Sequence, residues 1–370
     1  MILKQEHAGE SHGNKYIANF FGIPSGIYIN KNFIYSDLLK RKNLFFSSNR
    51  TLKELDNFFF FNGLINNITT KNPISLEVNN NIFSENVFIP EIFVFRPGHV
   101  DYSSFLKYKH SSVRIGAEFA SARNLIIKSI FGSICKQILN LFNVFICSDV
   151  FFIKNFKIIN FSVIDLKKIK KKHNFYYKNL IKEKKVNSQK GDSFSGAIEI
   201  NILNIPAGLG SYLKKIESII SEQIFNFKSV KGIEFLNSFK RFKYYSSYYN
   251  NNYDVFKKKN IKNSFFLDKK NGIEGGVSTG FPVTFRIFFK HINTIFLSNN
   301  SFNYLNNKEC LSFSERSDFS CILKSLIYLE NAVSIIFLDF FLEKFGSDNI
   351  IDIKNNFLNF SKFLRKKKIV

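Results

Sequence analysis

The chain has 370 residues, of which 45% are hydrophobic and 17% aromatic, and its formal net charge is +24. This length and apolar content exclude a disordered chain and predict a large folded core. No Pro-, Gly- or Ser-rich linker separates two self-contained patterns, so we expect one elaborated domain. Abundant Phe, Ile, Asn and Lys without Trp are typical of an AT-biased genome, which explains the lysine excess without a nucleic-acid partner.

The remaining composition narrows the class of protein further. No basic helix with base-reading side chains accompanies the charge, so we expect no specific nucleic-acid binding. The four cysteines (Cys135, Cys147, Cys310 and Cys321) lack C-x-x-C spacing and have apolar neighbours, which predicts free thiols rather than metal ligands or disulfides. The first motif begins by residue 9 and no apolar run approaches 18 residues, so we expect a cytosolic protein without a signal peptide or membrane contact.

The first motif is Gly9-Glu10-Ser11-His12-Gly13, a histidine between a hydroxyl, a carboxylate and two glycines. Flanking glycines let the backbone turn sharply and approach a ligand, although a histidine in a surface turn fits the pentapeptide equally well. Apolar stretches around Gly22-Ile23-Pro24-Ser25-Gly26 then predict strand, turn and strand over 20–29. The basic triplet 40–42 that follows is usually a solvated face.

The second motif is Arg96-Pro97-Gly98-His99-Val100-Asp101-Tyr102. Arg96 offers a planar fork for phosphate or carboxylate, and His99 can carry a proton near neutral pH. Ser121-Ala122-Arg123 follows, and isoleucines repeating every fourth residue predict an amphipathic helix with Ser121 as its N-cap. These are Ile126, Ile130, Ile134 and Ile138. Such a helix start suits an anion.

The second half alternates strands and helices. Ile198, Ile200 and Ile202 predict a strand, Leu213, Ile216, Ile220 and Ile224 predict a helix, and another strand begins at Val230. Stretches 165–190 and 240–266 are interpreted as a solvated excursion and a loop long enough to be a lid. A Gly-rich loop, 268–280, precedes a strand over Val283–Phe289, an order that differs from a dinucleotide-binding fold.

The last motif, Arg316-Ser317-Asp318, precedes an apolar helix expected from Cys321 to Phe345 and ending at Gly346. By itself it fits an N-cap aspartate with a paired arginine. The final twenty or so residues are interpreted as a frayed tail.

Together and in this order, the four motifs resemble chorismate synthase, over about Gly9 to Gly346. The resemblance implies an α+β fold of layered antiparallel sheets with helices, a β-α-β sandwich. It implies one catalytic domain over 1–346, with excursions at 165–190 and 240–266, a tail over 347–370, and a homotetramer. The implied reaction is 1,4-anti elimination of phosphate from 5-enolpyruvylshikimate 3-phosphate to give chorismate, a lyase step of aromatic amino-acid biosynthesis that uses reduced FMN without net redox change.

The resemblance also implies roles for individual residues. The catalytic group is His12 as proton donor to the phosphate, His99 beside the flavin, and Asp318 facing its reactive nitrogen. The residues implied to bind the anionic groups of the substrate are Arg41, Arg96, Arg123 and Arg316. The residues implied to contact FMN are Ser121, Ala122, Gly276, Lys290 and Thr294. The sequence departs from the family pattern at Ser47, Phe119, Ala120 and Asp268-Lys269.

Two questions stay open at the level of sequence. Some family members reduce their own flavin with NADPH, and nothing in the sequence decides this. An alternative function is a noncatalytic RNA-binding or assembly protein that retains an eroded enzyme fold, which the high charge and the departures would suit.

Overall fold

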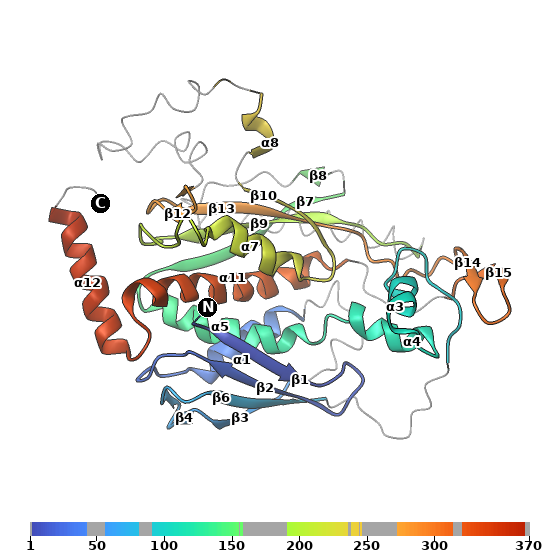
Figure 1. Ribbon diagram of the computed structural model, residues 1–370, viewed down its shortest axis with the longest axis horizontal. Coiled ribbons are helices and arrows are strands. Elements are labelled where there is room, and N and C mark those ends of the chain that lie inside the picture. The colour runs from blue at the N-terminus through green and yellow to red at the C-terminus, as the bar shows by residue number, and fades with distance from the viewer. Residues whose placement is uncertain are drawn as a thin grey trace.

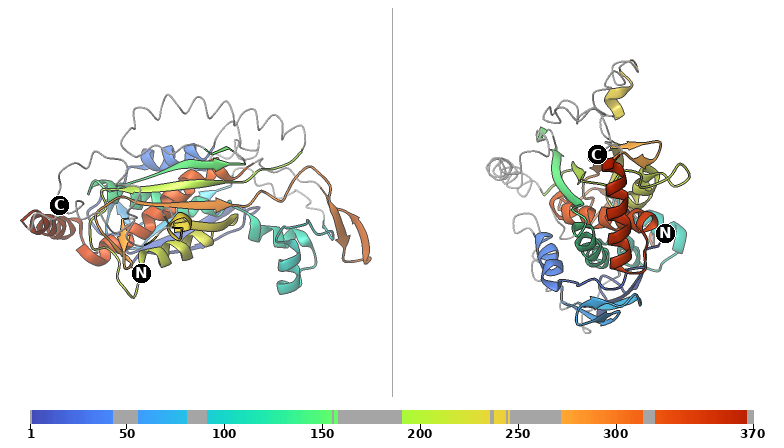
Figure 2. Two further views of the ribbon diagram at one scale, coloured as in Figure 1. Left: turned by 90° about the horizontal axis from the view of Figure 1, so that it is seen from above. Right: turned by 90° about the vertical axis from the view of Figure 1, so that its left-hand side faces the viewer.

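Two antiparallel sheets enclose a layer of helices in the computed structural model (Figure 1; Figure 2, right). The structure describes residues 2–42, 56–80, 91–154, 156–157, 191–235, 238–243, 245, 272–313 and 320–366. The expected α+β class and its sheet-helix-sheet layering are therefore confirmed, because the central helices α5 (Leu125–Asn140) and α11 (Ile322–Phe345) lie between the sheets.

The first sheet has the order β1 (Lys4–Ala8), β2 (Lys15–Phe21), β6 (Ile74–Asn79), β3 (Phe58–Asn62). The second has the order β10 (Val230–Phe235), β13 (Val283–Phe289), β9 (Gly196–Leu203), β7 (Phe145–Ile153), β8 (Phe156–Lys157). Three small hairpins are β4 (Leu64–Ile65) with β5 (Ile68–Thr69), β11 (Ile273–Glu274) with β12 (Val277–Ser278), and β14 (Asn300–Asn303) with β15 (Lys308–Leu311). The other helices are α1 (Lys31–Lys40), α3 (Asp101–Tyr108), α4 (Val113–Gly116), the 3₁₀ helix η1 (Ala117–Ala120), α7 (Ile216–Phe225), α8 (Ser238–Arg241) and α12 (Ile350–Lys366).

The chain folds as two copies of one topology, a repeat that the sequence analysis missed. Apart from the short elements β8 and α8 and one insertion in each half, the first half runs β1-β2-α1-β3-β4-β5-β6-α5 and the second runs β7-β9-α7-β10-β11-β12-β13-α11. The strand orders β1-β2-β6-β3 and β7-β9-β13-β10 correspond one to one. Ile23-Pro24-Ser25-Gly26 and Ile205-Pro206-Ala207-Gly208 mark the same turn in the two halves.

Matching hydrogen bonds hold this turn in both halves. Thr69 Oγ1 accepts from the Ile27 amide at 3.0 Å and donates to the Pro24 carbonyl at 2.6 Å. In the second half, Ser278 Oγ accepts from the Leu209 amide at 2.9 Å and donates to the Pro206 carbonyl at 2.6 Å. Each hydroxyl therefore joins a small hairpin to the segment that leaves the sheet toward α1 or α7.

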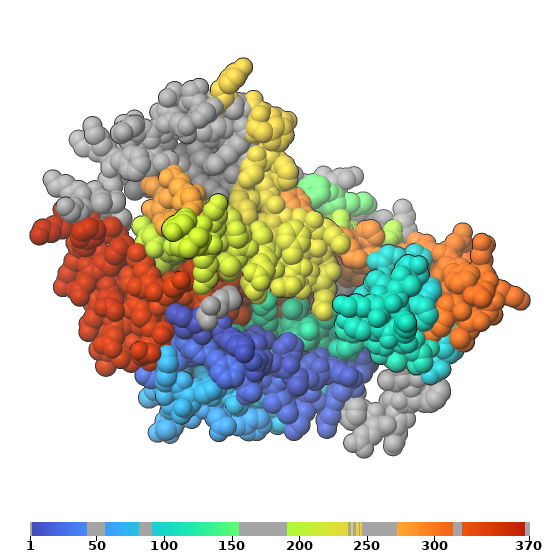
Figure 3. Space-filling model, in the orientation of Figure 1, coloured from blue at the N-terminus to red at the C-terminus, as the bar shows by residue number. Residues whose placement is uncertain are grey.

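Each half carries one insertion between its last sheet strand and its long helix. In the first half this is α3-α4-η1, and in the second it is β14-β15. The two insertions lie side by side at one end of the molecule (Figure 3), where the Phe95 amide donates to the Phe302 carbonyl at 3.3 Å. The second and third sequence motifs flank the first of these insertions, so both lie at this end of the molecule.

The helical layer confirms the strongest periodicities in the sequence. The isoleucine stripe of α5 and the alternating isoleucines of β9 are all 0–2% exposed. α5 and α11 approach closely at Gly132, where an added Cβ would lie only 2.2 Å from the Asn331 carbonyl oxygen. Charged side chains also connect the helices of this layer. Lys136 of α5 pairs with Glu330 of α11 and lies 3.7 Å from Asp37 of α1.

The prediction of strand, turn and strand over 20–29 is half wrong. β2 ends at Phe21, and the following segment bonds to the β4-β5 hairpin instead of pairing along a strand, with the Ile29 amide donating to Asn67. The helix α1 begins directly afterwards, because the Asn30 side chain accepts from the amides of Asn32 and Phe33. His12 precedes this segment and lies in the turn between β1 and β2.

The C-terminal segment also differs from the prediction. Residues 350–366, expected in a frayed tail, form the helix α12, which packs Phe357 and Phe360 against α11. The end of α11 at Gly346 is confirmed. Leu213 lies outside α7 and is 83% exposed, although the rest of the predicted helix face is buried. The excursion 165–190 and most of the loop 240–266 lie outside the described residues.

α11 is long and apolar enough to cross a membrane by length and composition, contrary to the expected absence of such a run. However, 89% of its most apolar window is buried inside the protein. Helices of this kind that pack between two sheets are core helices, and α11 has that position here.

We predict that the hydroxyl of Thr69 stabilises the first half as that of Ser278 stabilises the second. Thr69→Val and Ser278→Ala should each lower the free energy of unfolding by about 1 to 3 kcal/mol, because each leaves a buried amide and carbonyl without a partner. Chemical denaturation of both variants measures this, with Thr69→Ser and Ser278→Thr as controls that keep the hydroxyl. Stability equal to wild type in either hydroxyl-free variant would contradict the prediction.

Candidate functional site

His12 lies in the tight turn that joins β1 to β2. Gly9 has φ +130°, and a Cβ there would lie 2.7 Å from the Lys15 carbonyl oxygen, so the backbone requires glycine. Gly13 is different, because it has ordinary φ and an added Cβ would make only normal contacts. Its amide donates to the Glu10 carbonyl at 3.0 Å and closes the turn. The imidazole of His12 is half exposed.

A carboxylate that the sequence analysis did not identify holds this turn. Glu118 of η1 accepts from the Ser11 amide at 2.8 Å through Oε1, and from the Ser11 hydroxyl through Oε2. Ser11 Oγ in turn lies 3.0 Å from His12 Nδ1. Glu118 is 107 residues from Ser11 in the sequence, and it precedes the third motif without belonging to it, so the motifs gave no signal for the pair.

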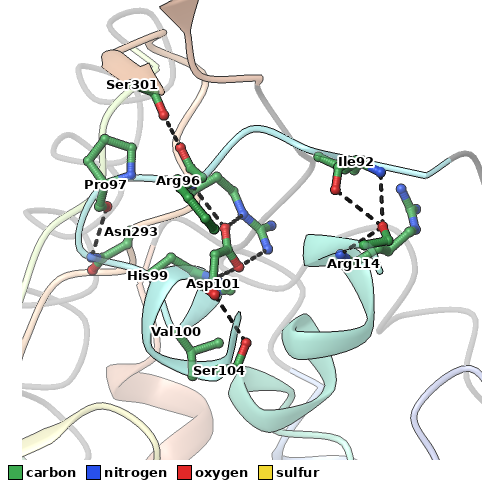
Figure 4. Close-up of polar contacts among 12 residues, drawn as sticks. Ile92, Arg96, Pro97, His99, Val100, Asp101, Ser104, Arg114, Asn293 and Ser301 are labelled. Atoms are coloured by element: carbon green, nitrogen blue, oxygen red, sulfur yellow. Dashed lines mark hydrogen bonds and ion pairs between the residues drawn. The ribbon is translucent and has the colours of Figure 1, made fainter. Parts of the chain in front are cut away.

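The second motif forms a buried ion-pair cluster at the start of α3 (Figure 4). Arg96 donates from Nε to Asp101 Oδ2 at 2.7 Å and from Nη2 to Asp101 Oδ1 at 2.8 Å. His99 Nδ1 lies 2.5 Å from Asp101 Oδ1. Burial alone would raise the pKa of Asp101, but hydrogen bonds from Arg96 and His99, and their charges, lower it to about 2.

The fork that sequence analysis assigned to a substrate anion therefore holds Asp101 in this structure. Arg96 is 5% exposed and Asp101 is fully buried, and the guanidinium also lies 5.1 Å from the centre of the Phe313 ring. The pair fixes the turn that carries His99, since the Arg96 amide also donates to Asp101 at 3.0 Å.

Lys290 and its neighbours cover the Pro97-Gly98 turn. Lys290 Nζ donates to the Gly98 carbonyl at 3.1 Å, and Asn293 Nδ2 donates to the Pro97 carbonyl at 3.3 Å. Gly98 has φ +70°, and a Cβ there would overlap Asn293 Nδ2. Burial, with the nearby charge of Lys231, lowers the pKa of Lys290. Thr294, one residue after Asn293, is half-buried in the same segment.

The connection between α7 and β10 links the two clusters. The Lys290 amide donates to the Ser229 carbonyl at 2.9 Å. Burial lowers the pKa of the adjacent Lys228, and the nearby charge of Glu118 offsets part of this effect. His12 and His99 are therefore placed at the same end of the molecule through Glu118, Lys228 and Lys290.

The third motif lies directly after η1. The Ser121 hydroxyl accepts from the Arg123 amide at 3.4 Å, so Ser121 caps the turn that leads into α5. The helix itself begins at Leu125 with Asn124 at the N-cap position, three residues later than an N-cap at Ser121 would place it. Ala122 is exposed and Arg123 is half-buried. Phe119, at a departure from the family pattern, stacks on Tyr108 with ring centres 4.9 Å apart.

Arg41 lies at the C-terminal end of α1. It is 4% exposed, pairs with Asp56, and donates from Nη1 to the Tyr328 hydroxyl of α11 at 3.1 Å. Lys42 Nζ lies 3.1 Å from the same carboxylate. Arg41 is therefore not part of a solvated face, although a basic triplet usually is.

Comparison with known proteins gives the family. The family model for chorismate synthase matches residues 3–342. A chorismate synthase of Clostridium tetani is 31% identical over 96% of both chains, and one of Caldanaerobacter subterraneus is 28% identical over 97% of this chain and 98% of that protein.

The chain belongs to the chorismate synthase family.

A solved structure described as a crystal structure of chorismate synthase has the same fold, with a TM-score of 0.73 and 22% identity over 98% of both chains. Within this chorismate synthase fold, Gly276 does not lie with Lys290 and Thr294. It occupies the β11-β12 turn at the other end of β13, a seven-residue strand that spans roughly 20 Å. Its φ of +85° and its contact with Lys215 explain the glycine by packing. Asp318, Arg316, Ser47 and Asp268-Lys269 lie outside the described residues.

We predict that Asp101 stabilises the chorismate synthase fold mainly above pH 4. A carboxyl whose folded pKa of about 2 lies below its ordinary value contributes stability above that ordinary value and loses it as the pH falls toward 2. Asp101→Asn should lower the free energy of unfolding at pH 7 by about 3 to 5 kcal/mol, because Arg96 stays buried without its carboxylate.

The difference from wild type should shrink by roughly 2 kcal/mol as the pH falls from 5 toward 2. Denaturant titrations across this range measure it, with Asp348→Asn, whose side chain is 87% exposed, as the control. A difference that does not change with pH would contradict the assignment of the low pKa to Asp101.

Proposed function

We propose that this protein catalyses the 1,4-anti elimination of phosphate from 5-enolpyruvylshikimate 3-phosphate to give chorismate, with reduced FMN and without net redox change. Family membership over residues 3–342 is the observation that carries the proposal. The convergence of the His12 turn and the Arg96-His99-Asp101 cluster at one end supports it, because the reaction needs proton-carrying groups beside anion-binding ones. Nothing in the described residues favours the RNA-binding alternative.

The substrate carries a phosphate and two carboxylates, so its site must be cationic. We assign this role to Arg123, at the leading turn of α5, together with Arg96, Arg41 and Arg316. Arg96 and Arg41 are each held by a buried aspartate, which keeps the guanidinium in place before the substrate arrives. The basic surroundings also include Lys228 and the largely buried Lys128, whose pKa burial lowers to about 8.

The residues at the Pro97-Gly98 turn fit the phosphate of FMN. Lys290 supplies a cation and Thr294 a hydroxyl hydrogen, and Asn293 Nδ2 carries a second amide hydrogen besides the one that it donates to Pro97. Ser121, Ala122 and Gly276 are the further candidates for FMN contact, of which Gly276 lies in the β11-β12 turn, at the other end of β13 from Lys290. Reduced FMN supplies electron density that assists the breaking of the C–O bond. His99, held through Nδ1 by Asp101, would keep its other ring nitrogen toward the flavin.

His12 would donate the proton that the departing phosphate takes, and Asp318 would assist removal of the ring hydrogen. The finer features of the family resemblance belong to the same proposal: a cytosolic homotetramer, with use of NADPH left open. The decisive test is chorismate formation by the purified protein with reduced FMN and the substrate. A protein that forms no chorismate while binding RNA at physiological salt would support the alternative instead.

We predict that FMN affinity depends on Lys290. Lys290→Ala removes a charge-assisted contact worth roughly 1.5 to 3 kcal/mol, so the dissociation constant should rise about ten- to a hundredfold. Fluorescence titration with reduced or oxidised FMN measures it, and Lys354→Ala, an exposed lysine of α12, is the matched control. An unchanged constant would remove Lys290 from the cofactor site.

We predict that the two motif histidines carry the proton chemistry. His12→Ala and His99→Ala should each lower turnover by roughly 10² to 10⁴-fold while FMN is saturating, because each removes a general acid-base group. His7→Ala serves as control, since it removes an exposed histidine of β1. Wild-type turnover in both motif variants would show that the site is wrongly placed.

A further inference from the structure

We propose that Glu118 is a positioning residue that sets, through Ser11, which nitrogen of His12 carries a proton. Three groups form the chain of contacts: the Glu118 carboxylate, the Ser11 hydroxyl and the His12 imidazole. The inference deepens the proposed function, on which its catalytic part rests, but its structural part stands on these contacts alone.

Hydrogen counting fixes the direction of each bond. An ionised carboxylate only accepts, so both Glu118 oxygens accept from Ser11: Oε1 from the amide at 2.8 Å, and Oε2 from the hydroxyl. A serine hydroxyl has one hydrogen, and here it is donated to Glu118. At the 3.0 Å contact Ser11 Oγ must therefore accept, so His12 Nδ1 is the donor.

This arrangement makes Nε2 the nitrogen that gains and loses the proton. In neutral His12 the hydrogen stays on Nδ1 and Nε2 is bare, whereas in the cation both nitrogens carry hydrogen. Donation from Nε2 to the departing phosphate then leaves the tautomer that Ser11 already stabilises. Ser11 is 3% exposed, which limits competition from water for these bonds.

The charged groups around Glu118 come from several elements. Ser11 and His12 approach it from the β1-β2 turn, and Lys228 faces it from the connection between α7 and β10. The closest approach of His12 Nδ1 to Glu118 Oε2 is 3.9 Å, so the serine hydroxyl is the nearer partner of the ring.

Glu118→Gln gives a sharp test because the Ser11 amide orients the new side chain. The amide N–H still needs an acceptor, so the glutamine oxygen must face it and the glutamine NH₂ must face the Ser11 hydroxyl. The hydroxyl then accepts from glutamine, and its hydrogen is released toward His12 Nδ1. We expect His12 to change from the Nδ1–H to the Nε2–H tautomer.

The measurement is ¹⁵N NMR of the full-length protein labelled at its histidines, at a pH where His12 is neutral. His12→Ala identifies the resonances among the six histidines. We expect Nδ1–H in wild type and in Glu10→Gln, the matched control that changes an exposed carboxylate in the same turn. We expect Nε2–H in Glu118→Gln, and loss of the Nδ1–H preference in Ser11→Ala, which serves if Glu118→Gln does not fold.

Turnover gives the second readout. Glu118→Gln should lower kcat by roughly 10- to 100-fold with a smaller change in KM. The protonated His12 carries a hydrogen on Nδ1, and in this variant the Ser11 hydroxyl no longer accepts it, because its own hydrogen points at Nδ1. An Nε2–H tautomer in wild type, or an unchanged tautomer in both Glu118→Gln and Ser11→Ala, would overturn the proposal. A wild-type protein with the expected tautomer but no chorismate formation would contradict the proposed function alone.

Discussion

The contact between α5 and α11 at Gly132 is the constraint on which the arrangement of the two halves depends. A side chain at Gly132 would overlap the backbone of Asn331, so only glycine permits this approach. Each long helix ends one half of the repeat, and each follows one of the two insertions. The distance between these helices therefore also sets how the insertions meet, and with them the segments that carry His99, Ser121 and Lys290.

The sequence predicted those elements whose burial follows a simple period. The isoleucines of α5 and β9 lie on one face at spacings of four and two, and every one of them is buried. α1 was missed because its start depends on an Asn30 side-chain cap rather than on periodicity. α12 was missed because its apolar contacts, such as Phe360 with Phe345, matter only once α11 is in place. The repeat was missed because equivalent positions in its two halves carry chemically similar rather than identical residues, such as Thr69 and Ser278.

The motifs of the candidate site could be found in the sequence, but not every carboxylate that contacts them in the folded chain. His12 and His99 stood out because each lies beside glycine and polar residues in a short pattern, and the fold places both at one end. Their carboxylate partners differ in how visible they were. Asp101 is inside the second motif, whereas Glu118 lies on a short 3₁₀ helix, 107 residues from Ser11. Contacts of that range are a property of the folded chain. Gly276 lies in a tight turn packed on Lys215, so packing alone is enough to explain its conspicuous glycine.

The net charge of +24 and the paired carboxylates act at different ranges. The excess of lysine and arginine sets a positive field that favours capture of anionic ligands and weakens with salt. Asp56, Asp101 and Glu118 act locally through hydrogen bonds and ion pairs. Asp56 holds Arg41 and Lys42, and Asp101 holds Arg96 and His99. Glu118 holds Ser11, which contacts His12. A guanidinium or histidine that is already held loses less freedom when a ligand binds. The carboxylates thus lower the positive charge of the candidate site but order it. For the proposed elimination, which depends on where protons and phosphate oxygens lie, that order is the larger contribution.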